Sequence, residues 1–199
     1  MHGRYYGNWL VASAKRYTLN ITVQQNEFSL RSEYEISTAG CIYTAQEKFL
    51  SWHDKITLMK PRGEVLARIK SRFPFLGSRY DFELSDGKVY RFWCEKLWKR
   101  VFACDGNNER YRHYEHKGLN YSVFQDDNQI AAFSKNRYKI GKGDQYEIRM
   151  NDDANFVIIV CLALTVDSSE YDDDTASFTV DVGNIGPEDR PFDESWEPN

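Results

Sequence analysis

The sequence contains only four cysteines, and no two of them stand in the C-x-x-C spacing that metal and redox sites use. They lie far apart along the chain, at Cys41, Cys94, Cys104 and Cys161. Cys161 falls inside the most apolar stretch, where a thiol behaves as a small hydrophobic group. The cysteine pattern therefore predicts a reduced, cytosolic protein that does not depend on disulfides.

No apolar run is long enough to cross a membrane. The most apolar stretch, Phe156 to Val166, has eleven residues, of which only Thr165 is polar. As a helix it would be about 16 Å long, half of the roughly 30 Å hydrocarbon thickness of a bilayer. The N-terminal apolar stretch, Trp9 to Ala14, is too short for a signal peptide. We therefore expect no transmembrane segment and a cytoplasmic location.

An excess of positive charge is also missing. The formal net charge is −4, with 26 Lys and Arg against 30 Asp and Glu. This balance argues against broad, sequence-independent attraction to nucleic acid or anionic lipid, although an acidic protein can still carry a local basic patch. We expect no nucleic-acid partner.

The motifs of common enzyme classes are absent: the chain has no G-x-S-x-G, P-loop or dinucleotide fingerprint. His113 and His116 stand in an H-x-x-H pattern that lacks a third metal ligand. His53 and Asp54 are adjacent on a predicted strand, so they face opposite sides and cannot form a dyad. The acids around the apolar run do not follow EF-hand spacing. We predict a non-enzymatic protein with no catalytic residue, metal site or cofactor.

What the sequence does contain is a period-two pattern. The chain has 199 residues, of which 41% are hydrophobic and 28% charged, as expected for one soluble domain. Between Tyr17 and Ile148, β-branched and aromatic residues alternate with polar ones. Glycines suited to tight turns follow three of the strands, at Gly40, Gly63 and Gly87. Repeated hairpins of this kind predict an antiparallel meander that closes into a barrel or packs as a sandwich.

The apolar run itself is better suited to a helix than to a strand. A strand apolar on both faces usually lies in a parallel sheet with crossover helices, which the preceding sequence lacks. A helix apolar on every side must be surrounded by protein. Asn151, Asp152 and Asp153 are N-cap candidates. Each β-branched residue costs a few tenths of a kcal/mol in helix propensity, but its burial contributes about 1.5–3 kcal/mol. We predict a helix at about residues 153–166, threaded through a barrel.

These features resemble the tubby C-terminal-like superfamily, and especially its LURP-one-related branch. Three segments carry the resemblance: "ITVQQNEFSLRSEYEISTAG" (Ile21 to Gly40), "KFLSWHDKITLMKPRGEVLARIKSR" (Lys48 to Arg72) and "QYEIRMNDDANFVIIVCLALTVDSS" (Gln145 to Ser169). The resemblance implies a mainly β fold, a closed antiparallel β-barrel of about twelve strands around a central buried hydrophobic helix near the C-terminus. The chain is also distantly similar to phospholipid scramblases, but it lacks their cysteine-rich palmitoylation cluster and Pro-rich N-terminal region.

We divide the chain into three parts. Residues 1–16 are predicted to form an N-terminal extension, and residues 17–183 a single tubby-like barrel domain. Residues 184–199 contain three of the five prolines and a cluster of acids, so we predict a flexible acidic tail.

The resemblance also implies phosphoinositide binding through surface Lys and Arg, because phosphate recognition needs charge-assisted donors that converge. The basic candidates are Lys96, Lys99 and Arg100 in "EKLWKR", and Lys135, Arg137, Lys139 and Lys142 in "SKNRYKIGKG". Lys135, Arg137 and Lys139 stand two apart, so on a strand they would share one face. That face would be a phosphate-binding row or, alternatively, an ordinary solvated outer face. We interpret Trp93 and Trp98 as barrel packing.

These considerations predict a non-enzymatic binding or scaffold module. Its expected ligands are anionic phospholipid headgroups, which would place it at the inner membrane surface. The alternative is a soluble structural or regulatory protein that contacts other proteins and has no lipid affinity. The sequence does not indicate an oligomeric state.

Overall fold

The computed structural model describes residues 19–26, 33–47, 54–72, 79–97, 100–136, 145–173 and 188–199. Within these ranges the chain forms twelve strands and one helix. The strands are β1 (Leu19–Asn26), β2 (Glu33–Ser37), β3 (Ile42–Glu47), β4 (Asp54–Met59), β5 (Val65–Ser71), β6 (Arg79–Leu84), β7 (Val89–Lys96), β8 (Val101–Gly106), β9 (Glu109–His116), β10 (Asn120–Gln125), β11 (Asn128–Asn136) and β12 (Gln145–Met150), and the helix is α1 (Phe156–Asp173). The predicted N-terminal extension, residues 1–16, lies outside the described residues.

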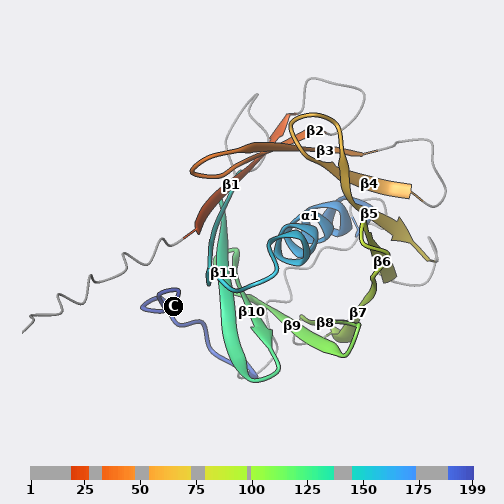
Figure 1. Ribbon diagram of the computed structural model, residues 1–199. Coiled ribbons are helices and arrows are strands. Elements are labelled where there is room, and N and C mark those ends of the chain that lie inside the picture. Colours follow the sequence, from red (N-terminus) through yellow and green to blue (C-terminus); the bar gives the residue numbers. More distant parts are fainter. Residues whose placement is uncertain are drawn as a thin grey trace, which may run out of the picture.

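All strands belong to one antiparallel sheet, in which each pairs with its neighbours in sequence. The first strand also pairs with the last, so the strand order is that of a closed barrel (Figure 1). Val23 on β1 is opposite both Ile36 on β2 and Tyr146 on β12. The predicted mainly β fold with one C-terminal helix is confirmed.

Alternation of side chains gives the sheet one apolar face. In β2, Tyr34 and Ile36 are buried, whereas Glu33 and Glu35 are exposed. Successive residues of a strand point to opposite faces, so this period-two pattern turns the apolar residues towards the interior of the ring. The same rule applies around the sheet, and most of the large aromatic side chains that it buries are contributed by β6 to β12.

The helix α1 runs through the middle of the ring of strands (Figure 1). Every residue from Ile158 to Leu164 is at most 1% exposed, as a helix enclosed on all sides requires. The one polar residue in the run, Thr165, donates its hydroxyl to the backbone carbonyl of Cys161 at 2.7 Å. The ring of Phe156 packs against Tyr43 on β3, with the ring centroids 4.8 Å apart.

The bounds of the helix differ from the predicted range of 153–166. The N-cap is Asn155, whose Oδ1 accepts hydrogen bonds from the N–H groups of Val157 at 3.1 Å and Ile158 at 3.3 Å. The acids predicted to cap the helix lie in the turn before it. At the other end the helix continues to Asp173, and no glycine or proline lies within it. Among the described residues, no helix is long and apolar enough to cross a bilayer.

One histidine, His113, lies in the aromatic part of the core. Its ring is 5.3 Å from Phe133, 5.5 Å from Tyr121 and 5.6 Å from Phe102, measured between centroids. Neither of its ring nitrogens has a hydrogen-bond partner among the described residues. Burial, with a smaller effect of His116, lowers the pKa of His113 from 6.5 to about 3. The imidazole is therefore neutral in the folded protein and packs as an aromatic ring.

The segment predicted as a flexible acidic tail, residues 184–199, has defined contacts where it is described. Residues 188–199 lie on the outside of the barrel, beside β10 and β11 (Figure 1). Their charged side chains pair with the barrel at Lys96, Asp127 and Arg149. The acids of this segment therefore find basic partners that composition alone did not indicate.

The enclosed helix leads to a first prediction. Replacing Ile159 by Asp should unfold the whole domain, because an unpaired buried charge costs several kcal/mol against a typical total stability of about 5–15 kcal/mol. The measurement is circular dichroism with thermal melting. Val89→Asp is the matched control, since Val89 is 45% exposed and should tolerate the charge. A folded, soluble Ile159→Asp variant would contradict the enclosed position of α1.

The buried histidine leads to a second prediction, about acid stability. Because the pKa of His113 is lower in the folded state, the unfolded chain takes up a proton below pH 6.5 that the folded chain does not. The free energy of unfolding should therefore fall as the pH drops from about 6.5 towards 3, by at most about 1.4 kcal/mol per pH unit from this group.

Urea melts of wild type and His113→Phe between pH 7.5 and 4.5 test this dependence. The variant should lose less stability with acid than the wild type does. The control Ile148→Val removes a buried methylene, so it should cost about 0.5–1.5 kcal/mol at every pH. Parallel pH profiles for wild type and His113→Phe would show that His113 has no part in acid sensitivity.

Candidate functional site

The seven predicted basic residues do not form one patch in the part of the chain that the structure describes. Four of them lie outside that part: Lys99, Arg137, Lys139 and Lys142. Lys96 pairs with Asp189, and Arg100 Nη1 pairs with Glu115 Oε1 at 2.6 Å. Both of these basic residues therefore already have an acidic partner within the protein.

Lys135 is buried, which differs from the predicted surface row. On β11 it shares a face with Ala131 and Phe133, and this face points into the ring. The side chain is 5% exposed, with its Nζ 5.4 Å from the ring centroid of Tyr146. Alternate residues of β11 share a face, and at Lys135 the register of the strand makes that face the inner one, whereas Arg137 and Lys139 lie outside the described residues. Lys135 is therefore not available to a phosphate group in solution.

The two histidines of the H-x-x-H pattern lie on opposite faces of β9. They are three residues apart, so His113 points inwards and His116 outwards. A single metal ion cannot bind both of them. In the described ranges, no group of three or more His, Cys, Asp and Glu residues could hold a metal ion.

His116 connects two other polar side chains on the outer face. Its Nδ1 is 2.9 Å from Glu188 Oε2, and its Nε2 is 2.7 Å from Ser122 Oγ. This order of acid, imidazole and hydroxyl matches the order in hydrolase triads. Ser122, however, is only 2% exposed and lies in mid-strand between β9 and β11, whose ladders occupy its backbone. A substrate therefore has no access to the Ser122 hydroxyl. The hydrogen bond between His116 and Glu188 attaches the C-terminal segment to the barrel.

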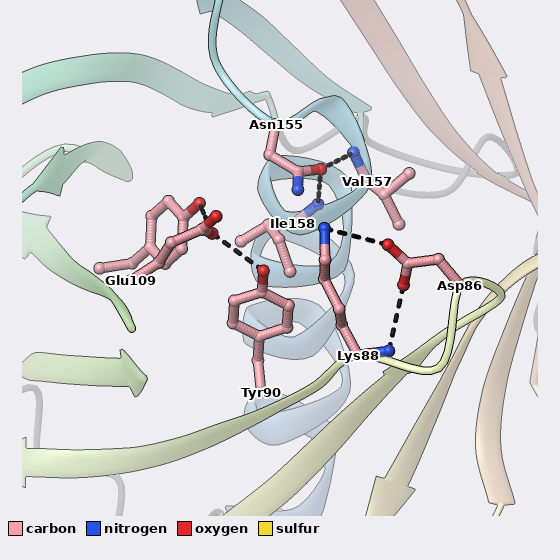
Figure 2. A network of polar contacts seen from close by, with 8 residues as sticks. Asp86, Lys88, Tyr90, Glu109, Asn155, Val157 and Ile158 are labelled. Atoms are coloured by element: carbon pink, nitrogen blue, oxygen red, sulfur yellow. Dashed lines mark hydrogen bonds and ion pairs between the residues drawn. The ribbon is translucent and has the colours of Figure 1, made fainter. Parts of the chain in front are cut away.

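A second polar network lies at the end of the barrel where the helix begins (Figure 2). Tyr90 on β7 and Tyr111 on β9 both donate their phenol protons to Glu109 Oε2, at 2.9 and 2.6 Å. Burial, followed by the bonds to Glu109, raises the pKa of both phenols. In the adjacent hairpin, Lys88 Nζ lies 3.1 Å from Asp86 Oδ2. Glu109 Oε2 thus accepts both of its hydrogen bonds from side chains of the protein. The network therefore links β7 to β9.

The described surface has an open groove on the outer side of β7 and β8. Its volume is about 430 Å³, and it is lined by Arg72, Val89, Arg91, Trp93, Asp105 and Gly106. Three of these residues alternate along β7 and therefore share its outer face. We call this set of six residues the β7–β8 groove.

Arg91 is an unpaired cation in this groove. It is opposite Asp81 on β6 and Asp105 on β8 in the strand register. Asp81 is already paired with Arg72 at 2.6 Å, and Asp105 with Arg112 at 2.7 Å. Among the described residues, no hydrogen bond or ion pair involves the Arg91 guanidinium, which is exposed. Its donors are therefore free for a ligand.

Gly106 forms part of the groove because it has no side chain. A Cβ atom at this position would lie 2.3 Å from the carbonyl oxygen of Val89 and 2.8 Å from the Cα of Tyr90. Any larger residue would push β8 away from β7.

Our sequence reasoning missed Arg91 and assigned Trp93 to packing. The alternation in "VYRFW" does place Val89, Arg91 and Trp93 on the face opposite to Tyr90 and Phe92, so part of the information is local. The pairing around Arg91 is not local, because Arg72, which follows β5, and Arg112 on β9 pair with the acids beside it.

Comparison with known proteins agrees with this architecture. A sequence model of the LURP-one-related family matches residues 19–167, which is about three quarters of the chain. No curated protein and no solved structure matches the chain. The matched range begins with β1 and includes the buried part of α1. The chain therefore belongs to the LURP-one-related family, within the tubby-like superfamily.

Proposed function

We propose that this protein is a non-enzymatic binding module whose ligand site is the β7–β8 groove. The observation that carries the proposal is the unpaired guanidinium of Arg91 beside Trp93 in an open groove. The interior of the barrel is less suitable for a ligand, because the helix and buried side chains such as Tyr121 and Phe133 fill it. We therefore assign ligand binding to the outer surface of the barrel.

The ligand that this groove suits best carries an anionic group, and we propose the phosphate of a phosphoinositide headgroup. A guanidinium can donate two parallel hydrogen bonds to a phosphate. Trp93 and the exposed Val89 add apolar surface, as membrane-interface residues do. This assignment would place the protein in the cytoplasm and, when bound, at the inner membrane surface.

The alternative is a protein-interaction module with no lipid affinity. It is favoured by the pairing of Lys96, Arg100 and Arg112 with acids, because these three cations are then not free to bind phosphate groups. Arg and Trp are also enriched at the centres of protein interfaces. In this case the groove would accept a carboxylate side chain and an apolar neighbour from a partner protein.

Vesicle co-sedimentation separates these functions. We expect the wild type to bind phosphatidylcholine vesicles that contain phosphatidylinositol bisphosphate, and to bind less to phosphatidylserine vesicles of equal charge. Arg91→Gln should weaken binding about fivefold, since one Arg near an anionic membrane contributes about 1 kcal/mol. The matched control is Arg68→Gln, which removes an exposed strand arginine outside the groove.

Three outcomes would contradict the lipid assignment. Absence of headgroup-dependent binding would favour the protein-interaction alternative. Equal losses for Arg91→Gln and Arg68→Gln would indicate non-specific attraction. Loss of binding only when Arg137 and Lys139 are both changed to Gln would move the site from the groove to the predicted row. Lys135 is kept in that variant, because a change at this buried position would also disturb the fold.

A further inference from the structure

The C-terminal segment is attached to the outer surface of the barrel by several side-chain contacts. We call residues 188–199 the C-terminal strap. Three consecutive residues at its start contact three separate elements: Glu188 pairs with His116 on β9, Asp189 with Lys96 on β7, and Arg190 with Asp127 in the turn between β10 and β11. The chain bends at Asp189 and Arg190, which allows neighbouring side chains to reach the barrel in different directions.

Beneath the strap, the outer face of β9 and β10 is aromatic. Tyr114 and Phe124 lie edge to face, with their centroids 5.4 Å apart. The Arg190 guanidinium is 4.4 Å from the Phe124 centroid and 5.8 Å from that of Tyr114. The ring of Phe192 is 5.2 Å from that of His116. Two strap side chains thus cover three rings. Arg190 also pairs with Asp127, and the covered ring of His116 bonds to Ser122 on the barrel.

This composition differs from that of an ordinary solvent-facing strand. The outer face of an antiparallel sheet is usually polar, whereas this one would expose a cluster of rings if the strap left it. The strap is separated from α1 by residues 174–187, a length of chain that can extend over about 45 Å. This length allows the strap to move off the surface without displacing α1.

Two of the ion pairs that hold the strap are exposed, and each is weak enough to exchange. The side chain of Asp127 is 93% exposed and that of Lys96 is 55% exposed. Exposed ion pairs contribute about 0–1 kcal/mol each. A cation above an exposed aromatic ring contributes about 0.5–1 kcal/mol. These weak contacts together keep the strap bound because it is tethered to the barrel, and a tethered segment has an effective concentration of about millimolar.

We propose that the outer face of β9 and β10 is a peptide-docking surface, which the strap occupies as an internal ligand. The partner that it fits is a peptide with the same chemistry as Glu188, Arg190 and Phe192: an acid for His116, an arginine for Asp127 and the two rings, and an aromatic residue two positions later. The partner gains access by displacing the strap. This surface is separate from the β7–β8 groove, so the inference does not depend on the proposed lipid function.

The test uses the full chain and a fluorescein-labelled synthetic peptide with the sequence of residues 188–199. In wild type the tethered strap competes, so fluorescence polarisation should detect only weak binding. Arg190→Ala combined with Phe192→Ala releases the strap and should increase peptide affinity about tenfold or more. Glu194→Ala is the matched control, because Glu194 is exposed and has no hydrogen bond or ion pair to the described part of the barrel.

A charge exchange distinguishes docking from a purely structural role. Adding Asp127→Arg to the released chain should abolish binding of the peptide, and a peptide with Asp in place of Arg190 should restore it. Thermal melts of each variant, with and without peptide, check the fold; a peptide-dependent rise in melting temperature supports docking. The proposal is overturned if the released chain neither binds the peptide nor is stabilised by it, or if the exchanged peptide binds no better than the original.

Discussion

The complete burial of α1 is the constraint on which the rest of the molecule depends. A helix with apolar side chains in every direction is stable in water only when protein surrounds it. A ring of strands provides that surrounding, and it also removes the sheet edges that would otherwise be open to other chains. The β-branched residues of the helix, such as Ile158 and Val160, are unfavourable for an isolated helix but fill the ring well.

A filled interior leaves the outside of the barrel for binding. There the charged residues are arranged as cross-strand pairs, for example Lys70 with Glu83 and Arg72 with Asp81. Such pairs contribute little stability each, but they neutralise the charges that they join. Against this background, an unpaired cation such as Arg91 and an aromatic surface such as that of Tyr114 and Phe124 are the features most suited to recognition. One is open in this structure, and the other is covered by the chain's own C-terminal strap.

The environment of a polar group decides what that group does here. His113 and His116 are close in sequence, yet one is a neutral ring in the core and the other connects Ser122 to Glu188. The latter set has the atomic order of a catalytic triad, but burial of Ser122 and its place in mid-strand make it an attachment point. Lys135 shows the same principle, since a lysine that spacing alone assigns to a surface row lies beside Tyr146 inside the ring.

The sequence by itself determined the alternating strands, the turns at glycines, the single helix and the family, because these depend on the chemistry of residues a few positions apart. Period two in "EYEIS" and the unbroken apolar run from Phe156 need no distant partner to be interpreted. Only the tertiary structure decided which face of β11 is internal, which acids leave Arg91 unpaired, and where Glu188 and Arg190 bind. These outcomes depend on strand register and on segments more than sixty positions apart, such as Asp127 and Arg190. Side chains that far apart meet only through the fold, so local patterns could not place them.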